Sequence, residues 1–402
     1  MTAAVPLATP RFSDSPNARS KSITTTTGPY SQGILNQHLD NNKAYQVGVH
    51  DDKGQRRTME DAYSFIVDFA GVRGQGYFAV FDGHAGKYAA EWCGGHFHEH
   101  LLEVLRTNST SPIPDVLNRT FHSVDSSLSA IAAKDDKMHS GCTAVMAFIR
   151  IEDAHGGQSF LEQSPVNSPR VSEPSINISD RPESPNASGT ESPVDKKYKK
   201  SRASRVVSAI KSLSTPSRSS SDLASTAESA ETTNSSSTDN VVLEKPVTPP
   251  SGMMLRRVLY TANAGDARGV LCRGGKAIRL TYDHKGSDRQ EAKRIMDAGG
   301  FVMGGRVNGV LAVTRSLGDS SMKEFVVGSP FTTETELGEE DEFLILACDG
   351  LWDIATDQQA VDLVRDIHDA QVASRTLVDF ALKESTDNIT VVVVRFPVAG
   401  KS

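Results

Sequence analysis

Three aspartates stand where an apolar run of the chain ends or begins. Asp82 and Asp349 each follow such a run, 77–81 and 342–348, and Asp387 lies two residues before a third, 389–394. Apolar runs of this length between polar turns are typical of buried strands, so each strand presents a carboxylate at one end. If the three strands belong to one core, the carboxylates converge. Only a cation makes such crowding of like charges tolerable.

Further acidic residues also lie at expected loops and strand edges. They are Glu60, Asp61, Asp266, Asp283 and Asp353. No cluster of histidines or cysteines accompanies them, and ligation by oxygen alone selects Mg²⁺ or Mn²⁺ over zinc or copper. Two such ions about 3.5–4 Å apart can share a bridging water, lower its pKa and direct it at a phosphorus atom. The pattern therefore indicates hydrolysis of a phosphoric ester.

Basic side chains close to these acids could complete such a site. Arg56 or Arg57 could make a bidentate contact with a phosphate, and His84 could protonate a departing alkoxide. Some of these residues also have a purely structural interpretation. An isolated histidine in a turn, such as His84, is usually structural. Asp266 and Asp319 each follow a glycine, as residues that form turns often do. The acidic residues by themselves would also suit a metal-dependent nuclease or phosphodiesterase.

The composition narrows the class of protein. The chain has 402 residues, 38% of them hydrophobic, and a net charge of −7, which argues against nucleic acid as the main partner. Its four cysteines form no C-x-x-C pair and no C-x₅-R motif, so we expect structural thiols in a reducing compartment and no phosphocysteine chemistry. No apolar run is long enough for a membrane span, and the N-terminus lacks the apolar core of a secretory signal. We expect a monomer in the cytoplasm, the nucleus or both, with a mitochondrial presequence as the alternative.

The elements that must position these residues follow from hydrophobic periodicity. Strands are expected at 43–49, 62–69, 77–81, 141–149, 256–264, 268–272, 276–281, 310–315, 342–348 and 389–394. Helices are expected at 87–106, 116–133, 289–298, 358–366 and 372–383. Many apolar strands, with helices set in pairs, predict an α+β sandwich with the sheets at its centre.

Two segments have the composition of disordered chain. Residues 1–41 are rich in serine, threonine, proline and asparagine, which predicts a disordered N-terminal tail. Residues 152–252 are roughly a third serine and threonine, with few aromatic residues, which predicts a disordered insertion within a domain spanning 42–398. The Ser-Pro and Thr-Pro pairs and the basic run 196–205 leave three interpretations open: a solvated tract, a tether controlled by phosphorylation, or a patch for nuclear import or anionic surfaces.

Eight short motifs follow one another along the chain. They are Arg56-x-x-Met59-Glu60-Asp61, Phe81-Asp82-Gly83-His84-Ala85-Gly86, Ser140-Gly141-Cys142-Thr143-Ala144, 262–268, Asp283-His284-Lys285, 306–313, 346–353 and Asp387-Asn388. In this order they resemble the metal-dependent serine/threonine protein phosphatases of type 2C, the PPM family, and look most like its fungal members. The resemblance covers the predicted domain except its insertion. It implies a central antiparallel β-sandwich flanked by pairs of α-helices, in four αββα layers.

The resemblance also implies a role for each matching residue. Metal positions are implied for Asp82, bridging two Mg²⁺ or Mn²⁺ ions; Asp349 and Asp387, at one ion; Glu60 and the carbonyl of Gly83, at the other; and Asp266 with Asp349 and Asp353, at a weaker third ion. Arg56 is expected to bind the substrate phosphate and His84 to act as general acid. Asp61 and Asn388 are expected to orient ligands.

The activity that the resemblance implies is removal of phosphate from phosphoserine and phosphothreonine in proteins by a metal-bridged hydroxide. The expected partners are phosphorylated proteins, and signalling kinases whose action the enzyme would reverse as a negative regulator. Two other classes stay open: an inactive relative that binds phosphoproteins, and an interaction protein dominated by the insertion. The chain departs from the family at Gly286, where proline is expected, and at Cys142 and Ala267, where serine is expected. We expect Gly286 to loosen the loop that carries Asp283.

Overall fold

The computed structural model describes residues 44–135, 139–162 and 246–397. The predicted tail 1–41 and most of the predicted insertion 152–252 lie outside the described residues. At the N-terminal end of that insertion, the strand β4 (Gly141–Asp153) continues past the expected boundary and the short helix α3 (Ser159–Glu162) follows. Glu152 is fully buried and pairs with Arg150 and Arg256, so the ordered domain extends beyond residue 152.

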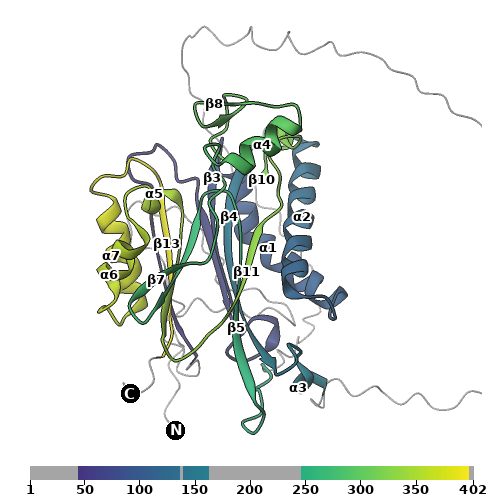
Figure 1. The fold of residues 1–402 in the computed structure, drawn as a ribbon, viewed down its shortest axis with the longest axis vertical. Helices are drawn as coiled ribbons and strands as arrows, with labels where there is room; N and C mark the ends of the chain where they lie inside the picture. The colour runs from purple at the N-terminus through teal and green to yellow at the C-terminus, as the bar shows by residue number, and fades with distance from the viewer. Residues whose placement is uncertain (1–43, 136–138, 163–245, 398–402) are drawn as a thin grey trace, which may run out of the picture. The chain divides into compact units, whose positions relative to one another are not determined.

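Two antiparallel sheets pack face to face (Figure 1). The first has the order β1 (Gln46–Asp52), β13 (Ile389–Arg395), β12 (Asp341–Ala347), β6 (Arg268–Arg273) and β7 (Lys276–Arg279). The second has the order β11 (Phe331–Glu336), β5 (Leu255–Ala264), β4, β3 (Gly76–His84) and β2 (Ala62–Val67), and β10 (Leu317–Gly318) pairs with β4. Strands distant in sequence are thus neighbours in each sheet.

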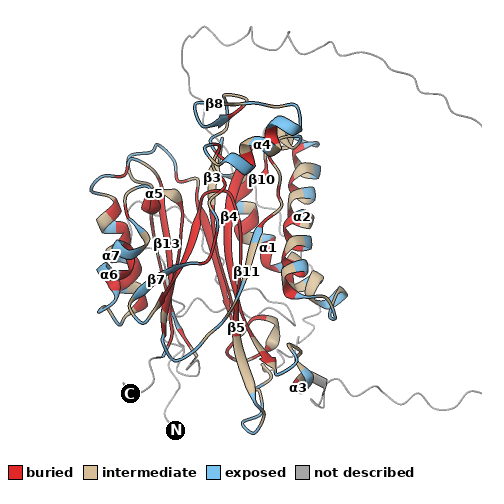
Figure 2. Cartoon of the chain, viewed as in Figure 1, coloured by how far each residue is buried: buried red, intermediate tan, exposed pale blue. Residues whose placement is uncertain are grey.

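The alternation of side chains along the strands builds three apolar layers. In β4, Met146 and Phe148 belong to the core under one pair of helices, whereas Val145 and Ile149 belong to the core between the two sheets. Successive side chains of a strand point to opposite faces, so a strand buried on both faces must be apolar throughout. Figure 2 shows this continuous burial at the centre of the domain.

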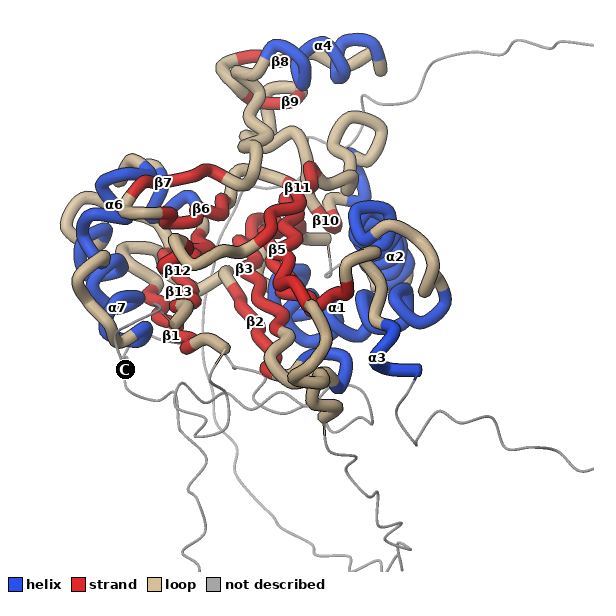
Figure 3. Tube along the Cα trace, turned by 60° about the horizontal axis from the view of Figure 1, so that its bottom comes forward, coloured by secondary structure: helices blue, strands red, loops and turns tan. Residues whose placement is uncertain are grey.

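Helices cover both outer faces of the sandwich (Figure 3). The pair α1 (Tyr88–Thr107) and α2 (Ile113–Ala132) packs on the six-stranded sheet. The short α5 (Asp349–Trp352), α6 (Asp357–Val364) and α7 (Ala370–Ala381) pack on the five-stranded sheet. The predicted α+β fold, with its antiparallel sandwich and flanking helices, is confirmed. Within the described ranges, no helix is long and apolar enough to cross a membrane.

A smaller segment at one end of the sandwich carries α4 (Arg289–Asp297), β8 (Val302–Met303) and β9 (Arg306–Val307) (Figures 1 and 3). The side chain of Asp288 caps α4 by accepting hydrogen bonds from the backbone N–H groups of Gln290 and Glu291. The helix ends before Gly299, whose φ is +88°. The predicted strand 310–315 is wrong: its residues make single bridges to three different segments and belong to no ladder.

Candidate metal centre and active site

Three of the predicted metal ligands gather at one end of the sandwich. Carboxylate oxygens of Asp82, Asp266 and Asp349 lie within 4.8 Å of one another. Asp82 belongs to β3, where Phe78 and Val80 face the core between the sheets, and the period of two gives Asp82 the same direction. Asp349 follows β12 of the opposite sheet, and Asp266 lies in the turn between β5 and β6. The cluster thus joins both sheets.

Burial and mutual repulsion make this cluster a poor place for free carboxylates. Burial, followed by the neighbouring carboxylates, raises the pKa of Asp82 well above its ordinary value and that of Asp349 to about 8. Burial also raises the pKa of Asp266. Among the described residues, no ion pair involves Asp82 or Asp349, and the nearby hydroxyl of Thr143 is buried without a hydrogen-bond partner. An oxygen-only donor set with unbalanced negative charge fits a hard divalent cation.

The remaining aspartate of the predicted dinuclear set, Asp387, lies outside this tight cluster and pairs with an arginine. Its Oδ2 atom is 2.6 Å from Nη2 of Arg56. The two side chains retain 59% and 36% of their exposure, and ion pairs of that kind contribute about 0–1 kcal/mol. The pair can therefore open at small cost when a phosphate or a cation competes for either partner.

Asn388 fixes the loop that carries Glu60. Its side-chain oxygen accepts a hydrogen bond from the backbone N–H of Glu60, and its Nδ2 donates to the carbonyls of Lys53 and Thr58. The Glu60 carboxylate accepts from the Thr58 hydroxyl and from the backbone N–H of Gly86. The side chain of Asn388 therefore holds this loop in place, and its role in orienting metal ligands stays a prediction.

Gly83 and Asp61 both lie beside Glu60, Gly83 by packing against its carbonyl and Asp61 as the next residue. A Cβ atom at Gly83 would overlap the carbonyl oxygen of Glu60, so glycine lets β3 approach the Glu60 loop closely. The buried Asp61 accepts a hydrogen bond of 2.8 Å from the hydroxyl of Thr390, and burial raises its pKa to about 6. Asp61 therefore lies behind the cluster, near Asp82, which contributes to its environment.

His84 is held by a residue that the sequence pattern alone assigned to a turn. Nε2 of His84 is 2.7 Å from Oδ2 of Asp319, which also accepts a hydrogen bond from Ser316. Asp319 does turn the chain, with a φ of +46°, but its side chain serves His84. A Cβ atom at Gly141 would overlap both members of this pair, so the glycine leaves room for it. No local signal distinguishes Asp319 from an ordinary turn former, because its partner is 235 residues away.

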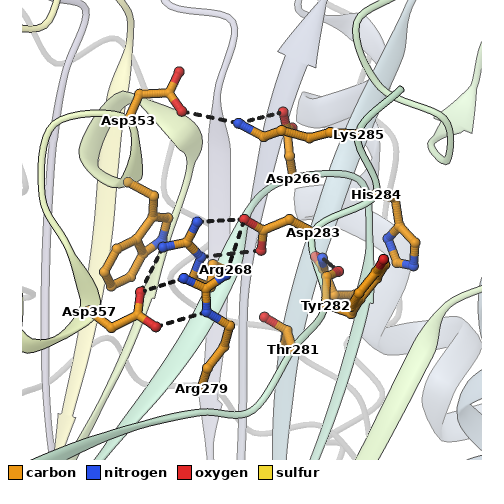
Figure 4. A network of polar contacts seen from close by, with 12 residues as sticks. Asp266, Arg268, Arg279, Thr281, Tyr282, Asp283, His284, Lys285, Asp353 and Asp357 are labelled. Atoms are coloured by element: carbon orange, nitrogen blue, oxygen red, sulfur yellow. Dashed lines mark hydrogen bonds and ion pairs between the residues drawn. The ribbon is translucent and has the colours of Figure 1, made fainter. Parts of the chain in front are cut away.

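Asp353 lies across a lysine from the cluster (Figure 4). Nζ of Lys285 is 3.1 Å from Oδ1 of Asp353 and 3.6 Å from Oδ2 of Asp266. Asp283, which was a candidate acid of the site, instead binds both Nε and Nη2 of Arg268. That arginine side chain is nearly buried, so Asp283 serves as a structural anchor for the loop before Lys285.

Most of the predicted residues line one cleft of about 500 Å³, but Asp61 and Asp353 are not among its lining residues. Its lining includes Arg56, Glu60, Asp82, Gly83, His84, Asp266, Asp349, Asp387 and Asn388. Arg57 and Arg306 add positive charge, and 311–313 add apolar surface. Arg306, which lies on β9, belongs to the motif 306–313, but nothing in the sequence indicates that its side chain reaches the site. The acidic base and the cationic lining together suit a phosphate group held over metal ions.

Comparison with known proteins agrees with this geometry. A family model described as Protein phosphatase 2C matches residues 45–158 and 185–389. Protein phosphatase 2C homolog 1 of Saccharomyces cerevisiae is 38% identical over 353 residues, which cover 87% of this chain and 93% of the yeast protein. Protein phosphatase 2C homolog 1 of Schizosaccharomyces pombe is 37% identical over 352 residues, which cover 87% of this chain and 72% of that protein. The expected similarity to fungal members is confirmed.

Solved structures share the fold at lower identity. A serine-threonine phosphatase 2C from Toxoplasma gondii superposes with a TM-score of 0.57 at 16% identity, covering 88% of this chain and 95% of that chain. A phosphatase from a pathogenic strain of Toxoplasma gondii gives a TM-score of 0.55 at 21% identity, covering 89% and 94%. With the ordered motifs, the acidic cluster and the fungal relatives, these matches lead to one conclusion. The chain belongs to the protein phosphatase 2C family, the metal-dependent serine/threonine protein phosphatases.

Proposed function

We propose that this protein hydrolyses phosphoserine and phosphothreonine esters in proteins at a centre of two Mg²⁺ or Mn²⁺ ions. The observation that carries the proposal is the convergence of Asp82, Asp266 and Asp349, whose pKa values are raised, in a cleft whose lining includes arginines. Within the described part of the chain, Asp82 and Asp349 form no ion pair with a basic side chain. Asp82, Asp349, Asp387 and Glu60, with the carbonyl of Gly83, would hold the two ions. When bound, such ions supply an activated water and neutralise charge on the phosphoryl group.

Arg56 is the group of the chain best placed to bind the substrate phosphate. Its planar guanidinium can make two parallel hydrogen bonds to phosphate oxygens, and its present partner Asp387 is exposed enough to give it up at small cost. Arg57 and Arg306 line the same cleft and would attract the phosphorylated segment. The apolar residues 311–313 would contact the rest of that segment.

His84 would donate a proton to the oxygen of the departing serine or threonine. An alkoxide is a poor leaving group, so its protonation during bond cleavage accelerates the reaction. Asp319 accepts a hydrogen bond from one ring nitrogen of His84, which holds the ring in one orientation and leaves the other nitrogen for the cleft. Because protein kinases form these esters, the reaction reverses kinase signalling, and the enzyme would act as a negative regulator of such a pathway.

Phosphate release from a phosphothreonine peptide tests the proposal. We expect release by the full chain with Mn²⁺ or Mg²⁺, none with chelator, and at least a hundredfold loss in the Asp349→Asn variant, because a ligand of the centre is removed. Asp297→Asn is the matched control, since that exposed aspartate at the end of α4 pairs only with Lys293 among the described residues. A folded chain that releases no phosphate with either metal would refute the proposal and favour an inactive phosphoprotein-binding relative.

A further inference from the structure

Lys285 places a positive charge between two carboxylates at the edge of the acidic cluster. Its ammonium is 3.1 Å from Asp353 and 3.6 Å from Asp266 (Figure 4). These are two of the three aspartates that the family resemblance assigns to a weaker third ion, and the other is Asp349. The described chain therefore already supplies a cation at this pair, whereas Asp82 and Asp349 have none.

The meeting of Lys285 with Asp266 follows from hydrogen bonds between their loops. The backbone N–H of His284 donates to the carbonyl of Gly265, and the N–H of Gly265 donates to Nδ1 of His284. Lys285 is the next residue after His284, and Asp266 is the next residue after Gly265. Two reciprocal bonds therefore fix the separation of the backbones that carry the ammonium and the carboxylate.

The other side of the Lys285 loop is held equally closely. Lys285 makes an isolated antiparallel bridge with Val313, and the N–H of Thr314 donates to the carbonyl of His284. A Cβ atom at Gly286 would overlap the carbonyl oxygen of Gly305, so the glycine permits close packing against the β8–β9 turn. The expectation that Gly286 loosens this loop finds no support in these contacts.

The ammonium is charged and yet replaceable. A lysine ammonium is charged at neutral pH, and the carboxylates of Asp266 and Asp353 beside it favour that charge. The Lys285 and Asp353 side chains keep 37% and 59% of their exposure, so water screens their attraction. A lysine has a flexible four-carbon stem, which lets its head move into solvent when another cation arrives.

We propose that Lys285 is a tethered competitor of the third divalent ion. An ion shared by Asp266 and Asp353 would have to displace the ammonium, because two cations at one carboxylate pair repel each other. Lys285 thereby weakens this site more than the inner site at Asp82 and Asp349, because among the described residues its ion pairs are with Asp266 and Asp353. The inference rests on the proposed function, since it assumes that the acidic cleft binds divalent ions.

Calorimetric titration of the metal-free full chain with Mn²⁺ tests this role without measuring catalysis. We expect the weakest class of sites to bind at least about tenfold more tightly in the Lys285→Met variant, with the tighter classes unchanged. Lys285→Arg keeps the charge and should stay within about threefold of the unchanged chain. Lys293→Met is the matched control, because it removes an exposed lysine and its ion pair with Asp297 on α4.

The outcomes separate the two proposals. Tight Mn²⁺ binding by the unchanged chain, with the same weakest affinity in Lys285→Met, would overturn the role of Lys285 alone. Equal tightening in the Met and Arg variants would also overturn it, because a loosened loop would then be the cause. No Mn²⁺ binding by the unchanged chain would refute the proposed function itself. Circular dichroism checks that each variant is folded. If Lys285→Met does not fold, Lys285→Gln takes its place and is judged by the same criteria.

Discussion

Replacement of Asp349 by asparagine is expected to stabilise the metal-free chain at neutral and alkaline pH. Burial, followed by the neighbouring carboxylates, raises the pKa of Asp349 in the folded chain to about 8, from an ordinary value of 3.8. Between these two values the folded chain binds more protons than the unfolded chain, so the free energy of unfolding falls as the pH rises. The loss begins near the ordinary pKa and is complete above the raised one.

The expected size follows from the width of that window. A difference of one bound proton changes the free energy of unfolding by about 1.4 kcal/mol per pH unit, which is roughly 4 kcal/mol between pH 5 and pH 8. For a domain of this size, 1 kcal/mol corresponds to about 2–4 °C in the unfolding temperature. Asparagine keeps the shape of the side chain and does not ionise. Over this pH range the unfolding temperature of the variant should therefore fall less than that of the unchanged chain, by on the order of 10 °C.

Thermal unfolding in chelator at pH 5, 6, 7 and 8 measures this difference, with Asp297→Asn as the control for an exposed aspartate. A parallel series with Mn²⁺ should show the opposite order, because the ion stabilises the unchanged chain and binds the Asp349→Asn variant poorly. If the unfolding temperatures of both chains fell equally as the pH rises, burial and the neighbouring carboxylates would not destabilise the ionised form of Asp349. The electrostatic account of the cluster would then be wrong.

Three further changes have specific expected results. Arg56→Ala should raise KM for a phosphothreonine peptide more than tenfold and change stability by less than about 1 kcal/mol, because its ion pair is exposed; steady-state kinetics and thermal unfolding measure both. Asp319→Asn should slow turnover of phosphothreonine peptide far more than of p-nitrophenyl phosphate, whose leaving group needs no proton from His84; equal losses would make the contact merely structural. Gly286→Ala should destabilise the chain by about 1–3 kcal/mol, since its Cβ would overlap the Gly305 carbonyl; an unchanged unfolding temperature would contradict that packing.

Hydrophobic patterning predicted the layers of this fold because its strands are buried on both faces. The run before Asp82 is apolar at every position, and such runs have few alternatives to a central strand. The edge strand β11 escaped prediction because its threonines and glutamates carry no apolar signal, and only pairing with β5 makes it a strand. Residues 310–315 failed in the opposite way: their apolar pattern indicates a strand, but they form a loop whose single bridges depend on three other segments, and Val310 is exposed.

The acidic side chains could be predicted as a site because each one sits at the end of a recognisable strand or in a turn beside it. Their partners could not. Lys285 is 68 residues from Asp353, and His84 is 235 residues from Asp319, so these contacts depend on the folded arrangement of loops. Polar residues in loops have many structural uses, and only the third dimension distinguishes an ordinary turn aspartate from one that holds a histidine.

The positions of Arg56 and Lys285 indicate where in the cleft negative charge is left unbalanced, and therefore where a metal ion should bind first. Arg56 balances the outer Asp387 on one flank, and Lys285 balances the outer Asp353 and the buried Asp266 on the other. The contacts with Asp387 and Asp353 are partly exposed and therefore weak. Asp82 and Asp349 lie between these flanks, where burial strengthens every charge interaction and no described cation pairs with them. Ions should accordingly fill the centre first, because there they relieve the strongest repulsion, and the flanks only as each tethered cation is displaced.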